Sequence, residues 1–157
     1  MGRKRGYTLI ELLVVLAVLS LLATVAIPLA EISVQREKER DLKRALWEIR
    51  DAIDAYQQAR KAGMLPSVGD ASLYPANLDV LTRAQHDGRP GHEGEVLRFL
   101  RRVPRDPFAN PGQPPEMSWG LRSYESDAEH PRAGSDVYDV YSRSQAMGLN
   151  GVPLSQW

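Results

Sequence analysis

The chain has 157 residues, with 20 basic side chains, 20 acidic side chains and no cysteine. This balance of charge provides no overall positive field for binding nucleic acid or an anionic surface. The lack of cysteine excludes a disulfide scaffold and metal sites built on thiolates, but it leaves the cellular compartment open.

The N-terminus joins a basic tip, Arg3–Arg5, to an uncharged segment that runs from Leu12 to Ala30. As a helix, that segment would be about 28 Å long, which is close to the thickness of a bilayer hydrocarbon core. Secretory signal peptides have their cleavage site after the apolar run. Here the expected cleavage point, between Gly6 and Tyr7, comes before it. The segment is therefore predicted to stay in the protein as a membrane span.

Two residues stand out in this region. Glu11 lies at the edge of the span, where a carboxylate is costly to bury and usually has a partner or reaches water. Pro28 lies inside the span, where it removes one backbone donor and leaves the carbonyl of Thr24 without its helical partner. A tolerated kink is one interpretation of Pro28, since such prolines are common in membrane helices.

A charged segment with helical periodicity follows the span. Gly63 and Pro66 mark its end, so the pattern predicts one helix from about Thr8 to Ala62. Its second half is an amphipathic stem, because apolar side chains recur on one face every three to four residues. These side chains are Leu42, Ala45, Leu46, Ile49, Ala52, Ile53 and Tyr56.

Beyond the stem we expect a small α+β domain. Tyr74–Leu81 is predicted to be a short helix with Pro75 in its first turn, followed by a surface loop at Gln85–Gly94. Val96–Val103 fits either a helical turn or a strand.

Two further segments are rich in strand-forming residues. Ser118–Tyr124 and Asp136–Ser142 are the predicted strands, and Glu125–Ser135 would join them as a long hairpin loop. Several prolines between Pro104 and Pro115 predict an extended, irregular path before the first of these strands.

The N-terminal residues Gly6-Tyr7-Thr8-Leu9-Ile10-Glu11 and the apolar run resemble the prepilin leader of type IV pilins and type II secretion pseudopilins. The resemblance implies that a prepilin peptidase cuts after Gly6 and methylates the new amine of Tyr7. It also implies that Glu11 pairs with the amine of a neighbouring subunit during filament assembly, and that Pro28 marks a segment that melts on assembly. Tyr7 replaces the family's usual phenylalanine.

Two C-terminal stretches are similar to the major pseudopilins of type II secretion. Pro104–Pro111 is similar to their "P-K-D-P-W-G-N-P" stretch, and Tyr138–Ser142 with Gly148–Gly151 is similar to their "D-V-x-S … A-D-G" ending. That ending implies a calcium loop, but Asn150 stands where those proteins have an aspartate. Ser142 and Asn150 with nearby carbonyls would make only a weak Ca²⁺ site, and Asn150-Gly151 also fits a simple turn.

No pattern of catalytic residues was found. The histidines His86, His92 and His130 lie in polar or Gly/Pro-rich segments without metal-site spacing, and Ser142 and Ser144 lie in no nucleophile elbow. The sequence therefore predicts a protein that is not an enzyme.

Together these features predict a leader at 1–6, a membrane and assembly helix at 7–31, a stem helix at 32–63 and an α+β domain at 64–157. The expected fold is pilin-like, with one long helix packed on a small antiparallel sheet. Lys and Arg residues flank both ends of the span, so charge counting does not settle orientation, and the periplasmic placement of the domain follows from the resemblance.

The function that the resemblance implies is that of a structural subunit of a periplasmic pseudopilus in type II secretion. The implied partners are other copies of the chain, other pseudopilins, the prepilin peptidase and an inner-membrane assembly platform, with no role for nucleic acid. One alternative is a type IV pilus or minor pilin subunit serving adhesion, DNA uptake or motility. Another is a single-span periplasmic binding module that never polymerises.

Overall fold

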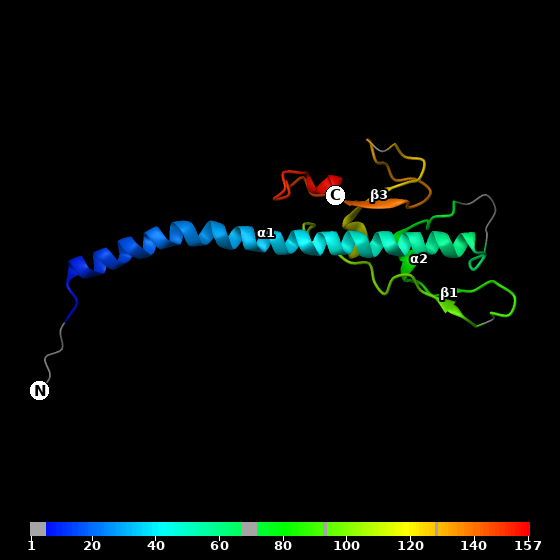
Figure 1. Ribbon diagram of the computed structural model, residues 1–157, viewed down its shortest axis with the longest axis horizontal. Helices are drawn as coiled ribbons and strands as arrows, with labels where there is room; N and C mark the ends of the chain where they lie inside the picture. Colours follow the sequence, from blue (N-terminus) through cyan, green and yellow to red (C-terminus); the bar gives the residue numbers. More distant parts are fainter. Residues whose placement is uncertain (1–5, 67–71, 93, 128) are drawn as a thin grey trace, which may run out of the picture. The chain divides into compact units, whose positions relative to one another are not determined.

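A computed structural model of the chain describes residues 6–66, 72–92, 94–127 and 129–157. The chain divides into two compact units, Met1–Glu37 and Lys38–Trp157. One helix, α1 (Leu9–Lys61), continues from the first unit into the second (Figure 1). The long N-terminal helix and the small antiparallel sheets of the C-terminal region confirm the predicted α+β, pilin-like architecture.

In the first unit, α1 carries no charged side chain between Leu12 and Ala30. It contains a window with mean hydropathy 2.8 that is long and apolar enough to cross a membrane, and none of that window is buried within the protein. Its hydroxyl groups bond to carbonyl oxygens of the preceding turn, as in Ser20 Oγ to Leu16 O at 2.8 Å and Ser33 Oγ to Leu29 O at 3.0 Å. The helix thus satisfies these hydroxyl groups within itself, as lipid requires.

In the second unit, one face of α1 forms the core, as the periodicity predicted. Leu42, Leu46, Ile49 and Ile53 are at most 2 % exposed, and Tyr56 packs against the edge of the core. The predicted stop is also confirmed. Gly63 adopts a positive φ of 71°, and the amides of Gly63 and Met64 donate to carbonyl oxygens of the last helical turn.

The short second helix, α2 (Leu78–Thr82), begins later than the sequence predicted. Pro75 precedes it instead of lying in its first turn. The helix starts at Asn77, whose side-chain oxygen accepts a hydrogen bond from the amide of Val80 at 3.2 Å. An Asn cap satisfies an otherwise unpaired helix donor, which proline cannot do. Leu78 and Leu81 then enter the core.

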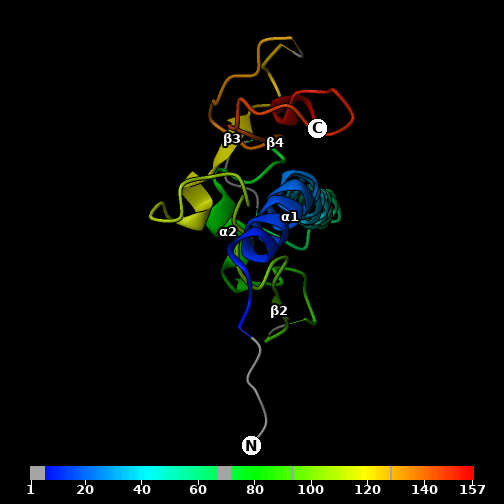
Figure 2. The ribbon, with the colours of Figure 1, turned by 90° about the vertical axis from the view of Figure 1, so that its left-hand side faces the viewer.

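The described residues form two separate antiparallel ladders. β1 (Gln85–His86) pairs with β2 (Val96–Leu97), so the expectation of a plain loop at 85–94 was wrong at its first two residues. For the segment 96–103 the sequence allowed either a helical turn or a strand. In the structure only its first two residues, β2, form a strand. Figure 2 shows β2 and the β3–β4 ladder on different sides of α1.

The predicted C-terminal hairpin is confirmed with shorter strands. β3 (Trp119–Arg122) pairs with β4 (Asp139–Ser142), with Trp119 opposite Ser142 and Arg122 opposite Asp139. Two short 3-10 helices, η1 (Pro115–Met117) and η2 (Leu154–Gln156), precede β3 and close the chain. Trp119, Val140 and Leu154 bring these elements into the core formed by α1 and α2.

Candidate functional site

The start of α1 is built as a reciprocal cap between Thr8 and Glu11. The Glu11 amide donates to Thr8 Oγ1 at 3.3 Å, and the Thr8 amide donates to Glu11 Oε2 at 3.4 Å. This arrangement is a capping box, in which two side chains satisfy two free donors at a helix N-terminus. The capping box was not predicted from the sequence, although Thr-x-x-Glu before an apolar run is its usual signature.

The cap places the Glu11 carboxylate beside the backbone where the predicted cleavage would create a new amine. Tyr7 directly precedes Thr8 and is 79 % exposed. The bond from Thr8 uses Oε2 of Glu11, and a carboxylate has a second oxygen that can accept from a cation. A positive amine is disfavoured at a helix N-terminus, so this carboxylate is the group best placed to stabilise one.

Gly6 has no packing role in the described part of the chain. A Cβ atom built at Gly6 would meet nothing within 4 Å, and its φ is not in the left-handed region that favours glycine. The fold of this chain therefore does not require glycine at this position. A peptidase that reads the residue on the N-terminal side of its cut would give a reason for it.

Pro28 lies inside α1, and the helix continues through it. Because proline has no N–H, Thr24 O lacks a helical donor at this turn. The Thr24 hydroxyl does not compensate for the missing bond, since it donates to Leu21 O at 2.7 Å. The turn before Pro28 is thus the place where α1 has one backbone hydrogen bond fewer.

In the second unit, the proline-rich segment Pro104–Pro111 meets the end of β4 at Asp106, which is 1 % exposed. Asp106 Oδ1 accepts from the amide of Phe108 at 2.8 Å, and Oδ2 accepts from Ser142 Oγ at 2.6 Å. The Asp106 amide donates to Ser118 Oγ at 3.1 Å. One buried carboxylate thereby joins the proline-rich segment to the end of β4, and its hydrogen bonds offset the cost of burying its charge.

The two residues of the predicted calcium site are engaged separately. Ser142 is fully buried against Asp106, whereas Asn150 is exposed and its Oδ1 accepts from the amide of Val152 at 3.1 Å. Gly151 has a positive φ of 76°, in agreement with a turn at Asn150-Gly151. A calcium ion would have to displace these bonds, so the two residues fit a calcium site poorly, and weak binding stays a prediction.

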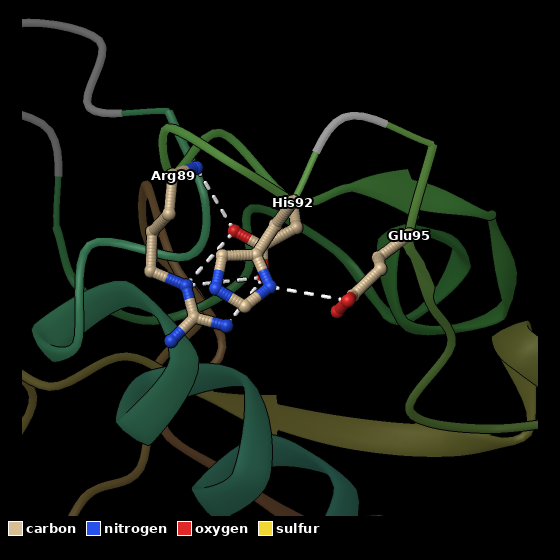
Figure 3. Close-up of polar contacts among 4 residues, drawn as sticks. Arg89, His92 and Glu95 are labelled. Atoms are coloured by element: carbon tan, nitrogen blue, oxygen red, sulfur yellow. Dashed lines mark hydrogen bonds and ion pairs between the residues drawn. The ribbon is translucent and has the colours of Figure 1, made fainter.

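The loop between β1 and β2 holds a cluster that the sequence analysis did not anticipate (Figure 3). Single ligand atoms of Asp87, His92 and Glu95 lie within 4.8 Å of one another. His92 Nδ1 lies 3.1 Å from Glu95 Oε1, but Asp87 is already bound by Arg89, whose Nη2 lies 2.6 Å from Oδ2. A metal ion there would be repelled by the guanidinium, so the contacts describe a loop held by the Asp87–Arg89 ion pair.

The Arg89 side chain lowers the pKa of Asp87 to about 2, mainly through its hydrogen bonds to the carboxylate. The Nε atom of Arg89 lies 3.0 Å from Oδ1 and 3.1 Å from Oδ2, and the Arg89 amide adds a third donor. These donors stabilise the charged form of Asp87. The pair therefore stabilises the first turn of the loop, directly after β1.

A second long-range contact, also missed, joins α1 to the C-terminal segment through Arg50. Its Nε lies 2.8 Å from Asp139 Oδ1, and its Nη2 donates to the carbonyl oxygens of Val140 and Trp157 at 3.1 and 2.9 Å. In the structure its bonded carboxylate is 89 residues distant, which no local pattern indicates.

Comparison with known protein families adds one finding. Residues 1–27 match the prokaryotic N-terminal methylation motif. Comparisons with curated proteins and with solved structures found no match for this chain. The motif together with the apolar helix indicates a single-pass anchor in the inner membrane. This motif is the one carried by the type IV pilin-like superfamily, whose members include the pseudopilins and are structural proteins; in this chain it covers the first 27 residues.

Proposed function

We propose that this protein is a structural subunit of a periplasmic pseudopilus that drives protein export in type II secretion. A prepilin peptidase cuts the precursor between Gly6 and Tyr7 and methylates the Tyr7 amine. The first unit of α1 then holds the subunit in the inner membrane, with the second unit in the periplasm. An inner-membrane assembly platform moves subunits from the membrane into a filament made of this chain and other pseudopilins.

The observation that carries the proposal is the exposure of the methylation-motif helix. Every described large aliphatic side chain between Leu9 and Val34 is at least 39 % exposed, all around the helix. Burying such a side chain contributes about 1.5–3 kcal/mol, so this surface has to be covered by lipid or by other helices. In the proposed mechanism lipid covers it in the stored subunit, and neighbouring copies cover it in the filament.

Glu11 is proposed to act as the assembly contact. Once α1 leaves the headgroup region, a carboxylate without a partner is costly, and a methylated Tyr7 amine of a neighbouring copy would neutralise it. The capping box keeps Glu11 at the helix start, with one oxygen bound to Thr8. Pro28 is proposed to ease local unwinding, because the turn before it already lacks one hydrogen bond.

The choice of type II secretion over a type IV pilus rests on the C-terminal half. The segment around Asp106 and the end of β4 resemble the corresponding stretches of major pseudopilins, and Asp106 and Ser142 bond to each other. That contact supports reading the two stretches as one structural unit of the domain. The role of the domain is then mechanical, and we propose no catalytic activity for it.

The experiment compares Glu11→Ala with Glu11→Asp and with Glu31→Ala, a carboxylate farther along the same exposed helix. The full chain is produced with its own peptidase and assembly platform, and both filaments and an exported protein are measured. Glu11→Ala should be cleaved but should lose about 100-fold or more in assembly, because a buried charge without its partner costs about 3–5 kcal/mol. Glu11→Asp should retain part of the activity, and Glu31→Ala should assemble normally.

Normal filaments and export from Glu11→Ala would contradict the assembly role. If filaments form but protein export does not depend on this gene, the type IV pilus alternative would be favoured. A wild-type chain that stays monomeric in the membrane would favour the binding-module alternative.

A further inference from the structure

The exposed side of α1 at the start of the second unit carries three cations and one large aromatic ring. Arg40, Lys43 and Arg44 are exposed, and Trp47 is 67 % exposed. Because an α-helix turns once in about 3.6 residues, these spacings keep the four side chains within a sector of about 100°. We call this sector the basic face. The opposite side of the helix enters the core at Ile49.

The cations of the basic face are only weakly neutralised within the second unit. None of the ion pairs among the described residues involves Arg40 or Lys43, although the Lys43 ammonium lies 4.5 Å from the centre of the Trp157 ring. Arg44 pairs with Asp41 at 2.6 Å, but 77 % of the Arg44 side chain is exposed, so this pair is weak and can exchange. The basic face therefore presents positive charge to whatever lies against it.

A C-terminal turn with apolar side chains lies beside the basic face. The Leu149 amide donates to Glu39 Oε1 at 2.8 Å, and Asn150 borders the same hollow of about 270 Å³ as Trp47. The turn exposes three apolar side chains, between 38 and 54 % each. They are Met147, Leu149 and Val152.

Exposed cations next to exposed apolar side chains are typical of surfaces that bind at a membrane interface. The cations attract anionic headgroups, and the apolar side chains enter the layer between headgroups and acyl chains. Tryptophan is enriched at this layer because its ring is apolar and its N–H is polar. Trp47 thus fits this environment better than it fits water.

We propose that the basic face and the C-terminal turn dock on the surface of the membrane that anchors the chain, through anionic lipid headgroups. The occupant follows from charge complementarity and from α1 itself, whose uncharged segment ends at Ala30, about 15 Å of helix before Arg40. The docked state is that of the stored subunit. The inference requires the membrane anchor, and it does not require copies that polymerise.

Docking requires the stem to lean towards the bilayer. Trp47 stands about 25 Å of helix beyond Ala30, so an upright stem would hold it outside the headgroup layer. A tilt of the span by up to about 40° and a bend of about 20° at Pro28 together allow a lean of about 60°. The helix axis at Trp47 would then lie about 13 Å above the hydrocarbon, and side chains that extend about 6 Å from the axis reach the headgroups.

The order of charges along the helix agrees with a leaning stem. On the same side of α1, Asp51 and Asp54 follow Trp47. In a leaning stem the cations lie close to the anionic surface and the two aspartates lie farther from it. A stem lying flat would press the aspartates against the headgroups, which repel them. The pattern therefore favours contact at the cationic end alone.

Quenching of Trp47 fluorescence tests the docking in the intact chain. The full chain is placed in lipid nanodiscs of phosphatidylcholine, alone or mixed with phosphatidylglycerol, with a nitroxide quencher on some headgroups. Because Trp119 and Trp157 also emit, the signal of Trp47 is the difference between the wild type and Trp47→Phe. Trp47 should be quenched, and its emission shifted to shorter wavelength, in the phosphatidylglycerol discs. Both effects should be much weaker in phosphatidylcholine and at high salt, which screens the attraction.

Removing the cations measures their contribution. Arg40→Gln/Lys43→Gln/Arg44→Gln should lower the ratio of docked to free units about 100-fold, since each cation near an anionic surface contributes about fivefold. Arg40→Lys/Arg44→Lys keeps the charge and should dock like the wild type. Arg98→Gln/Arg101→Gln is the matched control, because it removes two exposed arginines outside the basic face. Near-ultraviolet circular dichroism checks that each variant is folded.

Moving the reporter tests which face docks. In the Trp47→Phe background, Leu149→Trp should be quenched in the phosphatidylglycerol discs, because the C-terminal turn is part of the docked surface. Val96→Trp is the control, since Val96 is 53 % exposed and lies on β2. It should stay unquenched. Equal quenching of the two reporters would mean that no face is preferred and would overturn the proposal.

The outcomes separate this inference from the proposed function. Quenching of Trp47 that requires anionic lipid, low salt and the three cations would support the docking. The same Trp47 emission in every nanodisc would overturn it, and would leave the basic face for an acidic protein partner. Filament formation is measured separately, so a chain that polymerises without docking would leave the proposed function standing. A chain that docks but never polymerises would leave this inference standing alone.

Discussion

Replacing Asp106 by alanine should destabilise the second unit strongly. The carboxylate is 1 % exposed and accepts from the Phe108 amide at 2.8 Å and from Ser142 Oγ at 2.6 Å. Alanine would leave two buried donors without a partner, at about 1–3 kcal/mol each, while relieving part of the cost of a buried charge. The net loss should be about 3 kcal/mol, a large share of the 5–15 kcal/mol typical of a domain.

The assay is thermal unfolding of the full chain in detergent, followed by near-ultraviolet circular dichroism, where buried Trp119 reports tertiary packing. A loss of about 3 kcal/mol should lower Tm by roughly 10 °C for a unit of this size. Asp106→Asn should cost only about 1 kcal/mol, because its amide can still accept from Phe108 and donate to Ser142.

A double-mutant cycle with Ser142→Ala completes the test. Since Asp106 and Ser142 bond directly, the two changes should be non-additive by about 1 kcal/mol or more. An Asp106→Ala variant as stable as the wild type, or additive effects of the two changes, would refute the view that this pair joins the two C-terminal stretches.

Three further predictions concern other parts of the second unit. Because the pKa of Asp87 is lowered to about 2, the contribution of its charge to stability is complete above pH 4 and is lost as the pH falls towards 2. Unfolding curves measured between pH 5 and pH 2 should therefore show a smaller acid dependence for Arg89→Leu than for the wild type. Gly120→Ala should destabilise the domain because a Cβ there would overlap the Tyr141 ring, and a Tyr141→Ala change should suppress the effect in the same thermal assay. Calcium titration by calorimetry should give a Kd of about 10⁻³ M or weaker for the wild type. Asn150→Asp should bind calcium more tightly if the turn can form a calcium loop. Tight binding by the wild type would contradict the poor fit of Ser142 and Asn150 to a calcium site.

The parts of the fold that depend on local patterns were predictable. The three-to-four spacing from Leu42 to Tyr56 identified the core face of α1, and Gly63 marked its end. The strand-forming residues around Trp119 and Val140 identified the two strands of the C-terminal hairpin. Each of these signals is contained in a few neighbouring residues, so a single sequence is sufficient to detect it.

The parts that depend on distant contacts were not predictable. Asp106 meets Ser142 across 36 residues and Arg50 meets Asp139 across 89, and only the assembled fold brings these side chains together. The β1–β2 ladder has two residues per strand, so its period-two pattern is too short to separate from a loop. The cap at Asn77 is a different case. Asn is a common helix cap and was visible in the sequence, but the helix start was predicted from the neighbouring Pro75 instead.

The central claim, that the chain is a processed filament subunit, is tested most directly by the intact mass of the protein. Wild type and Gly6→Ala are purified from membranes of cells that contain the cognate prepilin peptidase. The substitution should leave the fold intact, since a Cβ at Gly6 meets nothing within 4 Å. The account predicts a wild-type chain that lacks residues 1–6 and carries one added methyl group, and a Gly6→Ala chain with neither change. A full-length, unmodified wild-type chain would contradict it.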